Sequence, residues 1–192
     1  GRTLPLPPAP PAELKLDKAP SMLPISRLVF PDSDAEADEF YSTACTALAH
    51  GVGNCRALLH GRKPVCTVGC YEASPAECYM AAGVTDPAWR GRGLARWLIV
   101  SLANELAADR TVRFACFPEL CDFYAQLGFL QIGKIQHYST DWMCASLYQS
   151  ALSVRRYTLC CCSQMPARRF LLQNPDTLFR LYHKGTHHPH DQ

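Results

Sequence analysis

The sequence predicts an α/β fold of the α+β kind: a mixed, mostly antiparallel central sheet flanked by helices, with a helical C-terminal extension. Apolar runs of strand length alternate with amphipathic helical patterns between residues 25 and 140. Turn sequences around Gly61 and Ser74 join three of these runs as successive hairpins, which gives antiparallel pairing. At 192 residues the chain is long enough for one such domain with its own core and further extensions.

The chain divides by composition into three parts. Residues 1–24 are rich in proline, which prevents regular helix, so we expect an extended, disordered leader or linker there. Residues 25–140 hold the alternating pattern and form the expected domain. Residues 141–192 are expected to be a partly helical extension, with helices over residues 143–156 and 174–183.

The N-terminal part of the domain predicts one strand and one helix. The apolar run of residues 25–30 indicates a first strand. Ser33 and Asp34 then precede an apolar stripe over residues 35–49, which predicts a capped helix that stops at Gly51. We expect this to be the single helix before the hairpins.

The remainder of the domain continues the alternation. Strands are predicted over residues 55–60, 64–72 and 77–85, followed by a helix over residues 94–107. Asp86-Pro87 ends the third of these strands, because proline donates no ladder hydrogen bond. A fifth strand, a short helix and a last strand or hairpin are predicted over residues 112–117, 120–127 and 129–138.

A loop rich in glycine and arginine joins the strand at residues 77–85 to the helix at residues 94–107. Gly91 and Gly93 allow the backbone to turn tightly, and the first amides of a helix have no partner inside the helix. These amides and the helix dipole favour an anion, and Arg90, Arg92 and Arg96 add positive charge around them. The loop is therefore predicted to bind a phosphate or pyrophosphate.

Two motifs in the domain resemble those of one superfamily. The loop fits the pattern Arg/Gln-x-x-Gly-x-Gly/Ala over residues 90–95, and residues 123–129 read Phe-Tyr-Ala-Gln-Leu-Gly-Phe. They occur in the expected order, separated by a predicted helix and strand. In both motifs the chain resembles the GNAT superfamily of N-acetyltransferases, over about residues 23–138.

The resemblance implies acetyl-CoA as cosubstrate and direct transfer of its acetyl group to a primary amine. The pantetheine arm would run beside the strand before the loop, with the backbones of Gly83, Val84 and Thr85 as hydrogen-bond partners. The pyrophosphate would lie at the loop itself, which consists of Arg90, Gly91, Arg92, Gly93, Leu94, Ala95 and Arg96.

Transfer from a thioester to an amine needs an acid for the departing thiolate and a base for the amine. The resemblance implies Tyr124 as the acid, with a buried aromatic role as the alternative. It also implies a glutamate on the strand before the loop, and Glu77 lies near the start of that strand. Regular alternation places Glu77 with Tyr79 on one face and Cys78 with Met80 on the other, unless a bulge exchanges the faces.

Other functional interpretations remain open. A non-catalytic acyl-CoA-binding or interaction module is the alternative to an enzyme, and the acceptor of an enzyme would be a small-molecule or protein amine. A net charge of +2 does not by itself indicate nucleic-acid binding. The basic residues of the tail favour either a solvated extension or a contact with RNA or an acidic partner; they are Arg155, Arg156, Arg168, Arg169, Arg180 and Lys184.

The eleven cysteines lack the spacing of a zinc site, and no metal is predicted. Most lie in apolar patterns, which favours buried thiols in a reducing compartment over a secreted disulfide framework. No run approaches the roughly 20 apolar residues of a membrane span. We therefore expect a cytoplasmic protein without membrane contact, whose oligomeric state the sequence leaves open.

Overall fold

The computed structural model describes residues 3–140 and 154–164, and the side chains of residues 3–134. Its elements follow one another in the order β1 (Leu14–Asp17), α1 (Met22–Val29), α2 (Asp34–Ala49), β2 (Asn54–His60), β3 (Lys63–Ala73), β4 (Glu77–Thr85), η1 (Pro87–Trp89), α3 (Leu94–Leu106), β5 (Thr111–Cys116), η2 (Pro118–Leu120), α4 (Cys121–Gln126), β6 (Leu130–Thr140) and β7 (Val154–Gln164).

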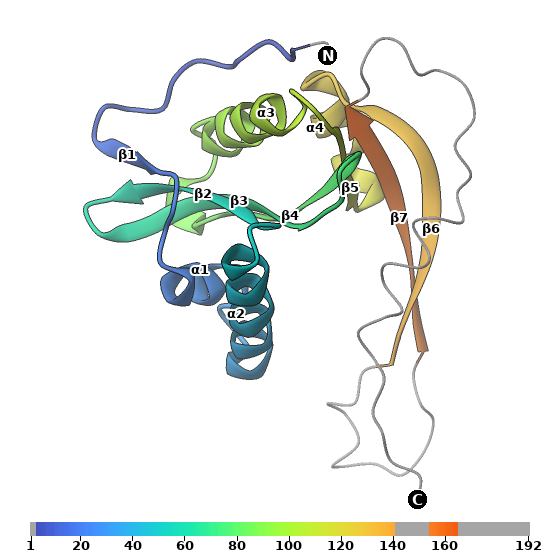
Figure 1. The fold of residues 1–192 in the computed structure, drawn as a ribbon, viewed down its shortest axis with the longest axis horizontal. Coiled ribbons are helices and arrows are strands. Elements are labelled where there is room, and N and C mark those ends of the chain that lie inside the picture. Colours follow the sequence, from blue (N-terminus) through green and yellow to red (C-terminus); the bar gives the residue numbers. More distant parts are fainter. Residues whose placement is uncertain (1–2, 141–153, 165–192) are drawn as a thin grey trace, which may run out of the picture.

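The strands form one seven-stranded sheet in the order β1-β2-β3-β4-β5-β7-β6. Only β4 and β5 are parallel neighbours in this described sheet, and every other neighbouring pair is antiparallel. Helix α3 lies on one face of strands β2 to β4, and α1 and α2 lie on the other (Figure 1). The predicted mixed, mostly antiparallel sheet flanked by helices is confirmed.

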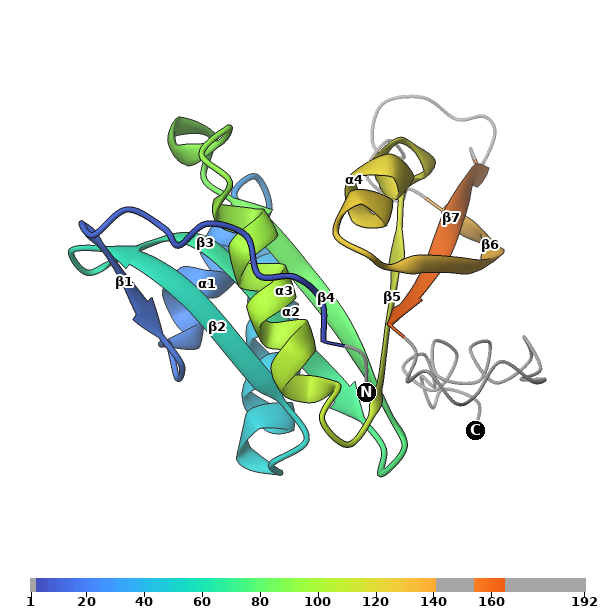
Figure 2. The same cartoon turned by 90° about the horizontal axis from the view of Figure 1, so that it is seen from above.

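The sheet splits where its two parallel strands meet. The ladder between β4 and β5 contains three residue pairs, Glu77↔Thr111, Cys78↔Val112 and Tyr79↔Arg113. Beyond these pairs the two strands diverge, so that β5, β6 and β7 turn away from the rest of the sheet (Figure 2). The opening between the carboxyl ends of β4 and β5 positions the candidate site.

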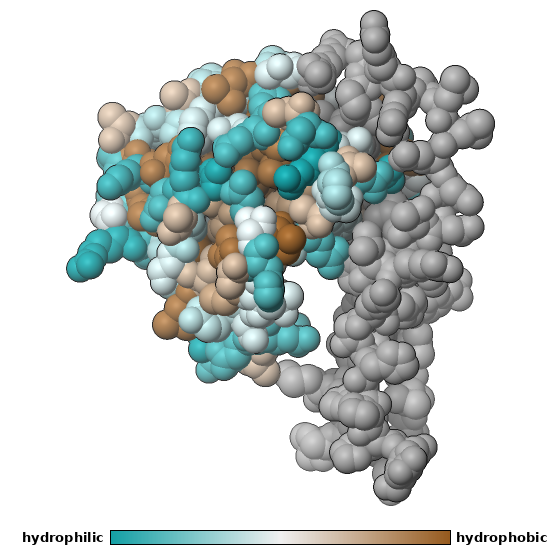
Figure 3. All heavy atoms as spheres, viewed as in Figure 1, coloured by the Kyte–Doolittle hydropathy of each residue, from teal (hydrophilic) through white to brown (hydrophobic). Residues whose placement is uncertain are grey.

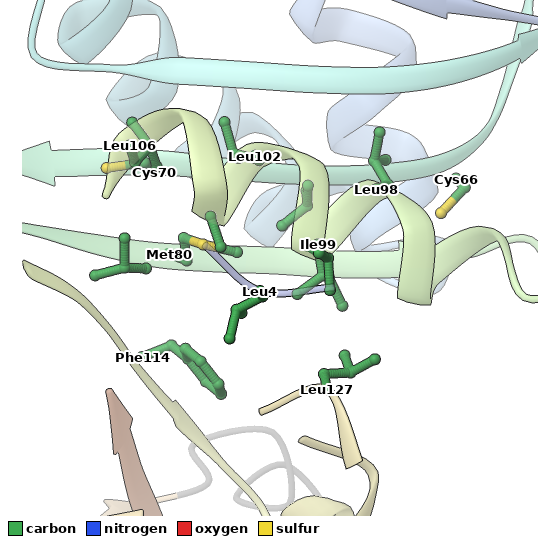
Figure 4. Close-up of a cluster of buried hydrophobic side chains, with 14 of the residues drawn as sticks. Leu4, Cys66, Cys70, Met80, Leu98, Ile99, Leu102, Leu106, Phe114 and Leu127 are labelled. Carbon is green, nitrogen blue, oxygen red and sulfur yellow. The ribbon is translucent and has the colours of Figure 1, made fainter. Parts of the chain in front are cut away.

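The core fills both faces of the first half of the sheet. The larger cluster lies beneath α3, where Leu98, Leu102 and their neighbours cover Cys66, Cys70 and Met80 of β3 and β4 (Figure 4). A smaller cluster lies beneath α1 and α2. Because helices cover both faces, β3 is buried over most of its length and reads as a continuous apolar run in the sequence.

The strand predicted over residues 25–30 is wrong, because this segment belongs to helix α1. Met22, Ile25 and Ser26 are buried on one face of the helix at the spacing of 3.6 residues per turn. Pro24 lies in the first turn, where a missing N–H breaks no helical bond. The chain therefore has two helices before β2 rather than the single one that we expected.

The expectation of a disordered leader is also wrong for the described part of residues 1–24. Strand β1 pairs with β2, and Leu4 is buried in the core between α3 and Leu127 (Figure 4). The Leu4 amide donates to Asn104 Oδ1 at 2.8 Å, and Asn104 Nδ2 donates to the Leu4 carbonyl at 2.9 Å. The segment thus runs across the outer side of α3 (Figures 1 and 2).

The elements predicted between residues 35 and 138 agree with those of the structure to within two residues at each end. Ser33 caps α2 by accepting a hydrogen bond from the Glu36 amide, as predicted. At the C-terminal end, residues 154–156 begin strand β7 instead of ending a helix. The remainder of that predicted helix, and the one over residues 174–183, lie outside the described residues. The division of the chain at residues 24 and 140 stays a prediction.

Candidate functional site

A cleft of about 310 Å³ occupies the opening between β4 and β5. Strand β4 forms one wall of the cleft, and β5, η2 and α4 form the other. Val68 of β3 and Ile99 of α3 also line it. None of the residues that line it carries a charged side chain. They are Val68, Tyr79, Met80, Ala81, Ala82, Gly83, Ile99, Phe114, Ala115, Cys116, Phe117, Leu120 and Tyr124.

Strand β4 carries a bulge at the cleft. Thr67 of β3 pairs with Val84 and Gly69 pairs with Ala81, so β4 contains one residue more than β3 between these pairs. The extra residue gives Ala82 a φ of 54°, which is rare for a residue with a side chain. Beyond the bulge, each side chain of β4 points to the face opposite the one that regular alternation would give it. Thr85 shows this, since its Oγ1 lies 3.3 Å from Cys66 Sγ on the α3 side of the sheet.

The loop at the start of α3 has the geometry of an anion site. Gly91 and Gly93 have φ values of +75° and +76°, and no atom lies within 4 Å of where a Cβ would stand. The first α-helical bond runs from the Trp97 amide to the Gly93 carbonyl at 3.1 Å, which leaves the preceding amides of the first turn for an external acceptor.

The turn that precedes the loop is fixed by Asp86. Its carboxylate accepts hydrogen bonds from the Ala88 amide at 3.0 Å and from Lys63 Nζ at 2.8 Å. The hydrogen bond from Lys63, followed by that from the Ala88 amide, lowers the pKa of Asp86 below its ordinary value. The carboxylate is therefore ionised at neutral pH and holds the end of β4 in place.

The three arginines that were predicted to bind a phosphate lie in and beside the N-terminal end of α3, which is called the mouth of α3 below. Arg90 Nε donates to the Thr85 carbonyl at 3.2 Å, which ties the loop to the end of β4. Arg92 lies over the Trp89 ring, with its Cζ 4.5 Å from the ring centroid. Arg96, in the first turn of α3, donates from Nη2 to Gln126 Oε1 of α4 at 2.8 Å.

The remaining residues predicted to bind the cosubstrate differ in what they offer. Gly83 lines the cleft, and Val84 and Thr85 continue β4 from the cleft to the loop. The Leu94 side chain is buried in the core, and Ala95 packs against the same core cluster. These last two residues can therefore serve the site through their backbone amides.

Tyr124 lines the cleft on the wall opposite β4. Its ring packs in an aromatic cluster, with centroids 4.4 Å from Phe114, 5.1 Å from Phe123 and 6.1 Å from Phe129. The contacts with Phe123 and Phe129 are edge-to-face, a geometry that aromatic pairs prefer, and the contact with Phe114 is tilted. Tyr124 therefore packs as an aromatic ring and also borders the cleft, and its role as the acid stays a prediction.

Glu77 does not line the cleft. It lies at the start of β4, where its Oε1 accepts a hydrogen bond from Arg113 Nη2 at 2.7 Å. Both residues belong to the three residue pairs of the β4–β5 ladder, so the ion pair lies where the two strands are still joined. The structure therefore brings Tyr124 to the cleft but leaves Glu77 outside its lining.

Several other lining residues were not predicted from the sequence. Tyr79 adds a second phenol on the β4 wall, and Phe117 and Leu120 are apolar side chains that remain 47% and 41% exposed. Tyr79 and Met80 are consecutive on β4 and both line the cleft, so alternation along the strand does not identify its lining residues. Nothing in the sequence distinguishes Leu120 from a core leucine.

The described residues also bear on metal binding, membrane insertion and the state of the cysteines. Among side chains 3–134, no group of three or more His, Cys, Asp or Glu could hold a metal ion. No helix in the described segments is long and apolar enough to cross a membrane. Cysteines 45, 55, 66, 70, 78, 116 and 121 are free thiols. The side chains of the basic tail and of Cys160, Cys161 and Cys162 lie outside the described residues.

Solved structures share this architecture. A protein from Desulfovibrio desulfuricans assigned to the GNAT family of acetyltransferases matches with a TM-score of 0.57 at 14% identity, covering 79% of this chain and 98% of its own. RimL, a ribosomal L7/L12 alpha-N-protein acetyltransferase in complex with coenzyme A, matches with a TM-score of 0.55 at 11% identity, covering 81% of this chain and 95% of its own. The chain has the GNAT fold.

The GNAT fold is shown by structure alone. No family model and no curated protein matches the sequence. A Pyrococcus horikoshii protein assigned as an acetyltransferase matches with a TM-score of 0.58 at 11% identity over 69% of this chain. The chain spans 49% of the length of that protein. The resemblance seen in the two sequence motifs is therefore confirmed at the level of the fold.

Proposed function

We propose that this chain transfers the acetyl group of acetyl-CoA directly to a primary amine. The observation that carries the proposal is the split between β4 and β5: Tyr124 borders its cleft on one wall, and β4 on the other wall leads to the loop at the start of α3. A fold alone hosts many functions, so the site has to support the activity. Here one strand, β4, connects the cleft that Tyr124 borders to the proposed anion site.

The residues present fit acetyl-CoA. The open space at Gly91 and Gly93 leaves room for a pyrophosphate against the first amides of α3. Arg90, Arg92 and Arg96 would balance its charge. The backbone of β4 beyond Tyr79 has no ladder partner on β5 within the described residues, so its N–H and C=O groups are the groups that would hold an extended pantetheine arm.

The chemistry of the lining suits acyl transfer to an amine. Acetyl-CoA supplies an activated thioester. An uncharged cleft disfavours an ammonium ion and therefore favours the neutral, nucleophilic amine. Tyr124 supplies a hydroxyl that can donate a proton to a departing thiolate. Glu77 as general base stays a prediction, and its pairing with Arg113 gives that role no support.

The acceptor is proposed to be a small-molecule or protein amine. RimL, whose structure matches this one, is a ribosomal L7/L12 alpha-N-protein acetyltransferase. In this chain the exposed Phe117 and Leu120 side chains border the cleft, which favours an acceptor with apolar groups next to its amine. A screen of amines and peptide N-termini separates the two classes.

A non-catalytic acyl-CoA-binding module is the second candidate. The observation that favours it is the lining of the cleft, which contains no carboxylate and no histidine and so offers no evident base. This candidate predicts that the chain binds acetyl-CoA but acetylates no amine in the screen. Substitution of Tyr124 would then have no effect beyond stability.

The first test is a calorimetric titration of acetyl-CoA into the wild type and into Gly93→Asp. A carboxylate at this position repels a pyrophosphate, so we expect binding in the wild type and a loss of at least about a hundredfold in the variant. Gly61→Asp is the matched control, because Gly61 also has a positive φ and open space but lies in the β2–β3 turn. Equal binding by wild type and Gly93→Asp would contradict the proposed anion site.

A further inference from the structure

Helix α4, which carries Tyr124, is too short to hold its own position. It contains six residues, and its N-cap residue Leu120 provides no side-chain hydrogen bond. A helix of this length is not stable without tertiary contacts. The orientation of Tyr124 therefore depends on what α4 touches.

One set of contacts fixes the side of α4 that carries Tyr124. The tyrosine ring packs on Phe114 and Phe129, and Leu127 is buried in the same core. Beyond the helix, the Leu127 and Phe129 amides both donate to the Tyr124 carbonyl, at 3.1 and 3.2 Å. These contacts anchor the end of α4 to the core but do not connect it to the anion site.

A second set of contacts connects α4 to the mouth of α3. Phe123 and Gln126 are one helical turn apart on α4. The Arg96 guanidinium lies 5.0 Å from the Phe123 ring centroid, and its Nη2 donates to Gln126 Oε1 at 2.8 Å. Arg96 is the third residue of α3 and so belongs to the turn whose amides face the anion site.

We propose that Gln126 is a positioning residue, which couples an anion bound at the mouth of α3 to the placement of Tyr124 through Arg96. A guanidinium has five donors in a rigid plane, so Arg96 can hold Gln126 and a phosphate oxygen together. An anion that fixes the guanidinium thereby fixes the Phe123 and Gln126 side of α4. Occupancy of the cosubstrate site then orders the helix that carries the proton donor.

The inference rests on the proposed binding of acetyl-CoA but requires no turnover to be tested. Hydrogen exchange of the amides of residues 127–129 reports the order of α4, because these amides donate to carbonyls of Tyr124 and Ala125. Coenzyme A serves as the probe, since it carries the pyrophosphate without the acetyl group. Its affinity is measured by calorimetry on the same samples.

Four proteins are compared: the wild type, Gln126→Leu, Gln126→Glu and Gln131→Leu. We expect coenzyme A to slow exchange of the amides of residues 127–129 about fivefold in the wild type. The effect should be lost in Gln126→Leu, which binds coenzyme A within about twofold of the wild type. Gln126→Glu keeps an acceptor for Arg96 and should retain the slowing. Gln131→Leu changes an exposed glutamine on β6 and should behave as the wild type.

Two results would overturn the inference, and they differ in what else they remove. If Gln126→Leu binds coenzyme A and shows the same slowing as the wild type, the coupling does not exist but the proposed function is unaffected. If the folded wild type does not bind coenzyme A, both the coupling and the proposed function are wrong.

Discussion

Individual side chains at this site act through partners that are far away in the sequence. Glu77 was expected to act as a base because of its strand, yet the residue that engages it, Arg113, lies on another strand 36 positions later. Arg96 was expected to serve a phosphate, and it also contacts Gln126 on α4. Tyr124, which the resemblance implied as the acid, lines the cleft, and its role stays a prediction. A motif identifies residue types at a spacing, but it does not specify which distant side chain will neutralise or orient them.

At the same scale, Tyr124→Phe tests the proton donor. The substitution keeps the ring that packs on Phe114, so we expect the affinity for acetyl-CoA to stay within about twofold and kcat to fall about a hundredfold. Steady-state kinetics on an amine identified in the screen measure both quantities. Tyr79→Phe is the control, because Tyr79 presents a phenol to the cleft from the opposite wall. Equal losses in the two variants would argue against a specific role for Tyr124.

A buried thiol gives a prediction for the dependence of stability on pH. Burial raises the pKa of Cys66 from 9.0 to about 11, and a hydrogen bond with Thr85 opposes the shift. A thiol whose pKa is raised by folding stabilises the protein below pH 9, and this stability is lost as the pH approaches 11. Urea titrations under reducing conditions should show that the free energy of unfolding falls between pH 9 and 11. The fall should be about 2 kcal/mol smaller in Cys66→Ala. Identical falls in both proteins would show that Cys66 does not titrate with folding.

Among the elements, α1 and β1 show where local patterns are ambiguous. An apolar run of six residues is compatible with a strand and with one face of a helix. Here the segment is helical, and Met22, Ile25 and Ser26 are buried on the same face of α1. Strand β1 was overlooked because the prolines around it suggested an extended leader. Its alternation of Leu14 and Leu16 with charged residues was the available signal. Both errors fall on segments whose structure is decided by tertiary contacts rather than by their own sequence.

The N-terminal segment is expected to contribute to stability as an element of the core. Leu4 is 6% exposed and packs between α3 and Leu127, whereas Leu6 is 56% exposed. Leu4→Ala should lower the free energy of unfolding by about 3 kcal/mol, because it leaves a cavity in the core. Leu6→Ala, the matched control, should change it by less than about 0.5 kcal/mol. Chemical denaturation measures both, and similar values for the two variants would contradict the packing of Leu4.

For the whole molecule, the order of strands and helices from β2 to β6 could be read from the sequence, but the split of the sheet could not. Alternation and turns indicate which strands are neighbours in a meander. They do not reveal that β4 and β5 form three residue pairs and then separate, because these two strands are joined through a helix and not through a hairpin turn. The surface does not indicate the position of the split either, since hydrophilic and hydrophobic residues are interspersed over the face shown in Figure 3.

A ligand in the split is expected to stabilise the molecule as a whole by joining its two halves. At an acetyl-CoA concentration about a hundredfold above the dissociation constant, linkage gives about 2.7 kcal/mol. For a chain of this size, this corresponds to a rise of about 5–10 °C in Tm. Differential scanning fluorimetry of the wild type and Gly93→Asp measures the rise. A shift of equal size in the variant would show that the ligand stabilises the fold from some other site.

The separation of β4 from β5 also bears on how such a protein diverges. Where two neighbouring strands stop pairing before they end, main-chain N–H and C=O groups face the opening whatever side chains the strands carry. A ligand that takes the place of the missing strand, and a phosphate held by amides, impose few demands on residue identity beyond the glycines of a turn. Chains can then exchange most of their residues while the architecture persists, and an identity of 11–14% beside a shared fold is the expected outcome.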